Sequence, residues 1–267
     1  MSSVLEKVFR KAAREKRAAF IPYITAGDPT PARTLELLRT LEKAGADVVE
    51  LGVPFSDPIA DGPINCAAAE RALSAGTSLT GVLQTVREFR YVSSLPIVLF
   101  SYVNPILFYG LSRFAVDAVS AGVNGVLLTD VPAEEAGPFF RTFSKVGIEL
   151  VPMVAPTSTR ARVREAKKLA QTFIYFVSRA GVTGPQKELP AALADQVQLV
   201  RKITGRRVAV GFGVAKAEQV AKIASFADGV VVGSAIVEKI AEIGDSPELP
   251  TAIQSFVKLL REATRRS

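Results

Sequence analysis

The sequence predicts an α/β protein, a (β/α)8 TIM barrel with an extra N-terminal helix, built as a single domain over residues 1–267. Eight short runs rich in β-branched and aromatic residues recur along the chain, and longer segments with helical periodicity separate them. No linker or shift in composition divides the chain. Eight such repeats in this length favour one barrel over a doubly wound sheet with a second domain.

The expected strands and helices alternate along the chain. The strands are expected at 19–25, 47–51, 96–101, 124–128, 148–152, 173–177, 207–210 and 229–232. The helices are expected at 31–44, 67–74, 79–90, 114–121, 134–146, 159–170, 191–203 and 217–225. In a barrel of this kind the strands end at one face, and the active site lies there.

The residues before the first strand predict a leading helix. Their apolar side chains fall at helical spacing: Val4, Leu5, Val8, Phe9 and Ala12. The segment is basic and amphipathic, as transit peptides are, but it also contains the acidic residues Glu6 and Glu15. We therefore interpret it as an ordinary helix of the fold.

The uncharged segment 91–112 has the length of a membrane span. Four residues that favour turns interrupt it: Pro96, Asn104, Pro105 and Gly110. They divide the segment into a strand, a turn and the start of a helix. The sequence therefore predicts no membrane association and a cytoplasmic protein.

The net charge of +7 belongs to the two ends of the chain. Residues 6–17 and 258–266 hold all of the excess, and the body between them is neutral. A nucleic-acid groove needs basic residues spread along one face with aromatic residues between them, and no such pattern crosses the body. We therefore expect solvated terminal helices and no nucleic-acid partner.

The chain has no histidine, and Cys66 is its one cysteine. This composition excludes a histidine base, zinc sites of the Cys/His type and disulfides within the chain, and we expect no metal site. Acid–base chemistry must fall to carboxylates, lysine or tyrosine. Cys66 itself is expected to be a small buried residue.

Glu50 is the first candidate for chemistry because it stands among the apolar residues Val48, Val49 and Leu51 of a strand. A carboxylate inside a barrel is costly unless it is paired or used. A proline-rich loop that contains Asp61 follows the strand, so the two carboxylates are expected to face the same end of the barrel. A desolvated glutamate has a raised pKa, whereas a loop aspartate is expected to stay ionised.

Several neighbouring residues allow a purely structural interpretation. Asp61 begins an Asp-Gly-Pro sequence that is also typical of a turn. Tyr175 is by default a core aromatic, although alternation can turn it toward the same lumen as Glu50. Asp28 and Asp130 stand before expected helices, so we expect N-capping from both.

Glycines follow the last two expected strands. Gly213 lies just past one strand, and Gly233 with Ser234 follows its neighbour. Backbone amides at such glycines can approach an anion, and the N-terminus of a following helix adds its dipole. Each pattern alone also fits a tight βα turn, but together they favour the phosphate site that is usual for this fold.

The motifs closely resemble the α subunit of tryptophan synthase over essentially the whole chain. The matching segments, in order, are 21–29 (IPYITAGDP), 50–63 (ELGVPFSDPIADGP), 130–132 (DVP), 178–184 (SRAGVTG), 211–213 (GFG) and 233–235 (GSA). The resemblance implies cleavage of indole-3-glycerol phosphate to indole and glyceraldehyde 3-phosphate. It also implies no cofactor in this chain and a β subunit, which binds pyridoxal phosphate, as partner in an α2β2 heterotetramer.

The resemblance also implies roles for individual residues. Glu50 would shuttle the proton, Asp61 would steady positive charge at the indole N–H, and Tyr175 would orient Glu50. The indole pocket would be lined by Tyr23, Phe100, Leu127 and Thr129. The phosphate would be held by Gly184, Gly213, Gly233 and Ser234.

Two long loops, 53–63 and 179–189, have the composition of a lid over the mouth. Thr183 would hydrogen-bond Asp61 when the lid closes. A partner is expected to pack on Pro54, Phe55 or Asn104 with Pro105, and so to favour the closed state.

Three alternatives remain beside the α half of a two-subunit synthase. One is a free-standing lyase that releases indole, and another is a different phosphate-binding barrel enzyme, such as an isomerase of the same pathway. The third is a catalytically silent barrel that only activates a partner, and the presence of both Glu50 and Asp61 argues against it.

Overall fold

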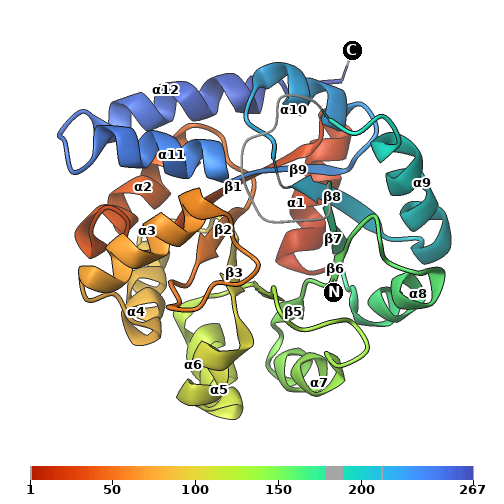
Figure 1. The fold of residues 1–267 in the computed structure, drawn as a ribbon, viewed down its shortest axis with the longest axis horizontal. Coiled ribbons are helices and arrows are strands. Elements are labelled where there is room, and N and C mark those ends of the chain that lie inside the picture. The colour runs from red at the N-terminus through yellow and green to blue at the C-terminus, as the bar shows by residue number, and fades with distance from the viewer. Residues whose placement is uncertain (1, 179–188, 212, 267) are drawn as a thin grey trace.

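The computed structural model describes residues 2–178, 189–211 and 213–266, and its parallel strands curl into a barrel with helices on the outside (Figure 1). The strands are β1 (Ala19–Thr25), β2 (Val49–Gly52), β3 (Ile97–Ser101), β4 (Gly125–Leu128), β5 (Glu149–Leu150), β6 (Met153–Val154), β7 (Phe173–Val177), β8 (Arg207–Gly211) and β9 (Gly229–Val232). Their order in the sheet is β5-β4-β3-β2-β1-β9-β8-β7-β6. The predicted barrel is therefore confirmed.

The strand expected at 148–152 is two short strands with Pro152 between them. β5 pairs with β4, and β6 pairs with β7. The Val151 amide donates to the carbonyl of Val126 at 2.9 Å, and the Pro152 carbonyl accepts from the Tyr175 amide at 3.0 Å. Proline has no N–H to continue the ladder, so the strand breaks there while still closing the barrel.

Helices cover the outer face of the sheet, apart from α1, which lies at one end of the barrel (Figure 1). They are α1 (Val4–Arg14), α2 (Pro31–Lys43), α3 (Pro63–Ser74), α4 (Leu79–Arg90), α5 (Val103–Tyr109), α6 (Leu111–Ala121), α7 (Gly137–Val146), α8 (Arg160–Leu169), α9 (Leu193–Thr204), α10 (Ala217–Ala224), α11 (Ser234–Ile243) and α12 (Leu249–Glu262). The prediction for α3 began four residues late, because Pro63 takes the first helical position, where a missing N–H costs nothing. The prediction had no counterpart to α5 or α11, and the turn expected from Asn104 and Pro105 is instead part of α5.

Helix α1 closes the end of the barrel where the strands begin. Phe9 packs on Phe173, the first residue of β7, with ring centroids 4.9 Å apart. A Cβ added at Gly229, the first residue of β9, would lie 3.1 Å from the Phe9 ring, so glycine makes room for it. The leading helix is thus confirmed, and the opposite end of the barrel is left for the functional site.

The basic ends of the chain are only partly solvated, which corrects the expectation from charge. Arg17 is 3% exposed, and its guanidinium pairs with both carboxylate oxygens of Asp47. Arg266 donates to the carbonyls of Ala224 at 2.8 Å and Ala227 at 2.7 Å. These arginines therefore fasten the two ends to the barrel. Within the described ranges, no helix has both the length and the apolar character needed to cross a membrane.

Candidate active site

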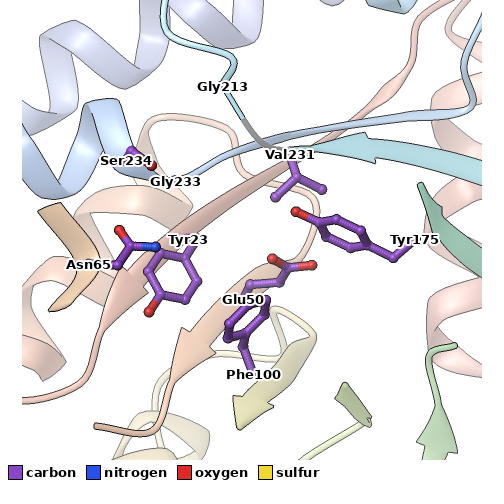
Figure 2. A pocket seen from close by; sticks show the side chains of 9 residues that line it. All are labelled: Tyr23, Glu50, Asn65, Phe100, Tyr175, Gly213, Val231, Gly233 and Ser234. Atoms are coloured by element: carbon purple, nitrogen blue, oxygen red, sulfur yellow. The ribbon is translucent and has the colours of Figure 1, made fainter. Parts of the chain in front are cut away.

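A cavity opens where the strands end, and residues from several strands and helices line it (Figure 2). It encloses about 320 Å³ of space between atoms, part of which is open to solvent. Its lining residues are Tyr23, Glu50, Asn65, Phe100, Tyr175, Gly213, Val231, Gly233 and Ser234. The carboxyl end of a barrel is where enzymes of this fold place their chemistry.

Glu50 projects into this cavity from the middle of β2. It is 1% exposed, and its register partners on the neighbouring strands are Tyr23 and Val98. Its Oε1 has no hydrogen-bond partner among the described residues. Burial raises the pKa of Glu50 from 4.5 to about 8, and no cation or donor among the described residues compensates the buried charge. At neutral pH the carboxyl therefore carries a proton.

Two tyrosines flank Glu50 in the cavity (Figure 2). Burial, together with the neighbouring carboxylates, raises the pKa of both Tyr23 and Tyr175, so both phenols stay neutral. A Cβ at Gly52 would lie 2.3 Å from the Tyr23 hydroxyl, and one at Gly211 would lie 2.0 Å from the Tyr175 hydroxyl. Glycine at these two strand ends therefore leaves space for the hydroxyls. The expectation that Tyr175 turns toward the lumen is confirmed.

Asp61 lies in the loop before α3, held by two neutral donors. The Tyr102 hydroxyl donates to Oδ2 at 3.0 Å, and the Asn65 amide donates to Oδ1 at 3.4 Å. Burial raises the pKa of Asp61, while these two hydrogen bonds act to lower it. The expected contrast with Glu50 is thus one of degree, because the loop aspartate is also desolvated.

Two glycines of the predicted phosphate site lie in the part of the chain that the structure describes, and both are at the cavity. Gly213 and Gly233 both line it, and Gly213 has a φ of +80°, which favours glycine. Ser234 is the first residue of α11, so the N–H groups of the first helical turn lie at the cavity wall. Gly184 and Thr183 lie outside the described residues.

The predicted indole-pocket residues divide into two groups. Tyr23 and Phe100 line the cavity, with ring centroids 5.2 Å apart in an edge-to-face arrangement. Leu127, on β4, pairs in register with Phe100 on β3 and is fully buried in the same inner cluster. It is not part of the cavity lining. Thr129 lies past the end of β4, where its amide donates to the carbonyl of Ser101 at 3.0 Å.

Comparison with known proteins agrees with this geometry. The family model for the tryptophan synthase alpha chain matches residues 9–265. The tryptophan synthase alpha chain of Solibacter usitatus is 46% identical over 255 residues, which is 96% of each chain. The chain belongs to the tryptophan synthase alpha chain family. The resemblance drawn from the motifs is therefore confirmed.

Solved structures of the family share the whole fold. The tryptophan synthase subunit alpha of Legionella pneumophila superposes with a TM-score of 0.92 at 36% identity, covering 99% of each chain. The tryptophan synthase complex of Pyrococcus furiosus contains a chain that matches with a TM-score of 0.85 at 38% identity, covering 92% of this chain and 99% of that one.

Sequence analysis missed one polar residue that lines the cavity, Asn65. The helix was expected to begin at residue 67, so Asn65 was left in the loop. Pro63 is a standard first helical residue, and starting the helix there places Asn65 in its first turn, four residues after Asp61.

Three structural expectations were wrong. Asp28 caps no helix but pairs with Arg71 at 2.7 and 2.9 Å. Asp130 accepts from the amide of Val103, the first residue of α5, and so caps a neighbouring helix rather than its own. Cys66 is only half-buried, because it lies beside the Asp61 loop rather than in the core.

Replacing Glu50 with Gln should change the pH dependence of stability. The folded pKa of about 8 lies above the unfolded value of 4.5, so the folded state holds the proton more tightly and wild type loses stability as pH rises between them. We expect Glu50→Gln to unfold at the same temperature as wild type near pH 5, and at a clearly higher temperature at about pH 8.5.

Thermal unfolding followed by circular dichroism measures this difference. The exposed Glu135→Gln serves as the matched control and should follow wild type at both pH values. An identical pH dependence of wild type and Glu50→Gln would contradict the buried, destabilised carboxyl.

Proposed function

We propose that this chain cleaves indole-3-glycerol phosphate to indole and glyceraldehyde 3-phosphate, with Glu50 as the acid–base group. The lyase activity belongs to the family. The single observation that supports the residue assignment is the desolvated Glu50 carboxyl, which faces the cavity and has no cation beside it among the described residues. A carboxyl with a pKa of about 8 can both deliver and accept a proton near neutral pH.

The proposed reaction returns Glu50 to its starting state. Protonated Glu50 transfers its proton to C3 of the indole, which leaves positive charge on the ring. The carboxylate then removes the proton of the glycerol hydroxyl next to the ring. The carbon–carbon bond breaks, its electrons restore the aromatic ring, and the hydroxyl carbon becomes the aldehyde. One proton is delivered and one is recovered, so Glu50 ends protonated.

Asp61 is proposed to stabilise the positive charge that develops over the indole nitrogen. Its hydrogen bonds from Tyr102 and Asn65 favour the charged carboxylate against the effect of burial. Each carboxylate oxygen can accept a further hydrogen bond, so these contacts leave capacity for the substrate. Tyr175 is proposed to orient Glu50, and Thr183 to hold Asp61 when the substrate is bound.

The remaining residues are proposed to bind the two ends of the substrate. Tyr23 and Phe100 offer an apolar surface for the indole ring, supported by Leu127 and Thr129 around the end of β4. At the other end, Gly184, Gly213, Gly233 and Ser234 are proposed to hold the phosphate. The N-terminus of α11 supports this assignment, because its amides and dipole favour an anion.

A β subunit that binds pyridoxal phosphate is the proposed partner, in an α2β2 assembly. An apolar groove beside the active-site loop includes Phe55, Pro105 and Phe108, and Phe108 is 98% exposed. An exposed apolar surface of this kind is typical of a protein interface. The Phe55 ring lies 5.4 Å from that of Tyr102, which holds Asp61, so a partner in the groove would contact the support of the catalytic loop.

Turnover should depend on the protonated form of Glu50. We expect kcat/KM to be level below about pH 8 and to fall above it, because the carboxyl loses the proton that it must deliver. Glu50→Gln should reduce turnover by about 10² to 10⁴, since the amide cannot transfer a proton. A Glu50→Gln enzyme that keeps more than about a tenth of wild-type turnover would remove Glu50 from this role.

Asp61→Asn should likewise lose turnover with the fold intact.

Phosphate binding should depend on glycine at 233. Gly233→Val places a branched side chain between the α11 amides and an anion, so calorimetry should show strongly weakened binding of inorganic phosphate and glyceraldehyde 3-phosphate. The matched control is Gly81→Val on exposed helix α4, which should bind as wild type does. Unchanged affinity in Gly233→Val would place the anion elsewhere.

Addition of a β subunit should raise kcat for indole-3-glycerol phosphate. Phe108→Ser should remove most of this activation while leaving the isolated chain as active as before, because Phe108 lies on the groove and not in the cavity. Tyr91→Ser, at the exposed C-terminal end of α4, is the control and should be activated normally. Wild type that gains nothing from a β subunit would favour a free-standing lyase.

A further inference from the structure

Asn65 stands between Asp61 and the cavity. It lies in the first turn of α3, is 5% exposed and lines the cavity, where Figure 2 shows the nitrogen end of its amide beside Tyr23. Asp61 does not belong to the cavity lining. A molecule in the cavity therefore meets the Asn65 side chain on the side from which Asp61 acts.

The two ends of the Asn65 amide have different surroundings. The nitrogen donates to Asp61 Oδ1 at 3.4 Å, whereas Oδ1 of Asn65 is buried without a partner among the described residues. The reversed amide would place two acceptor oxygens together, so the contact with Asp61 favours this orientation. A buried amide oxygen without a donor destabilises the folded chain, and a donor on a bound ligand would relieve that cost.

We propose that Asn65 binds the substrate directly, its amide oxygen accepting a hydrogen bond from the N–H of the indole ring. This inference rests on the proposed function, in which Asp61 faces the ring nitrogen. The hydroxyl next to the ring is assigned to Glu50, the second hydroxyl lies one carbon nearer the phosphate and so farther from Asp61, and the phosphate has no donor to offer when ionised. The ring N–H is the donor that remains, and it belongs next to the carboxylate that the Asn65 nitrogen holds.

The hydrogen bond strengthens as the reaction proceeds. When Glu50 protonates C3, positive charge reaches the ring nitrogen and its N–H becomes a stronger donor. An acceptor already held in place stabilises that state more than the ground state, so Asn65 contributes mainly to kcat. We expect Asn65→Leu, which keeps the approximate volume and removes both polar ends, to lower kcat about tenfold or more with a smaller change in KM.

A pair of unreactive ligands isolates the contact. 3-(Indol-3-yl)propyl phosphate lacks the glycerol hydroxyls but keeps the ring N–H, and its benzothiophene counterpart has sulfur in that position. Wild type should prefer the indole compound about tenfold or more, because the site contains acceptors for the N–H. Calorimetry should show that Asn65→Leu loses most of this preference.

The same comparison in an Asp61→Asn background separates a direct contact from an effect through Asp61. If Asn65 touches the ring, adding Asn65→Leu to Asp61→Asn reduces the remaining preference further. If Asn65→Leu lowers the preference for the indole compound only when Asp61 is intact, Asn65 acts solely by supporting Asp61. That result would overturn the direct contact. A preference unchanged by Asn65→Leu would overturn the inference outright.

Two controls keep the result interpretable. Ser234→Ala, at the phosphate end, should weaken both ligands equally and leave their ratio unchanged. Thermal unfolding of Asn65→Leu should occur near the wild-type temperature, because the substitution removes both an unpartnered buried oxygen and the long hydrogen bond to Asp61, which act in opposite directions. Failure of both ligands to bind wild type would instead refute the proposed function, a result distinct from binding with an unaltered ratio.

Discussion

The desolvation of one carboxyl group is the constraint on which this active site depends. Glu50 is buried inside the barrel, and the described residues place no cation beside it and no hydrogen-bond donor on its Oε1. A fold gains nothing in stability from such a group, so its presence indicates use. Its neighbours leave the space around it unfilled, since glycines at the ends of β2 and β8 make room for the tyrosine hydroxyls.

The contacts that stabilise the barrel and the residues of the candidate site lie at opposite ends of it. At the end where strands begin, α1 inserts Phe9 against Phe173, and an ion pair from Arg17 to Asp47 secures the start of β1. At the end where strands finish, polar groups gather around a cavity. Because the first end is filled with apolar side chains, a substrate has access from the second, where loops can vary without loss of the core.

The polar groups at the mouth act as a connected set. Tyr102 and Asn65 come from different parts of the chain, and both donate to Asp61. Tyr102 also packs on Phe55 at the edge of the exposed apolar groove. The Asp61 carboxylate is thus linked through Asn65 to the cavity and through Tyr102 to the edge of the exposed apolar groove.

The sequence by itself determined the barrel, the positions of its strands to within a few residues, and the candidacy of Glu50. Periodicity is a local property, and one acidic residue in an apolar strand is visible without coordinates. The tertiary structure decided which distant groups meet. Asp28 looked like a cap but pairs with Arg71, and Asn65 looked like a loop residue but joins Asp61 to the cavity. Such partners are set by barrel closure and helix packing, which bring together residues that local sequence patterns do not relate.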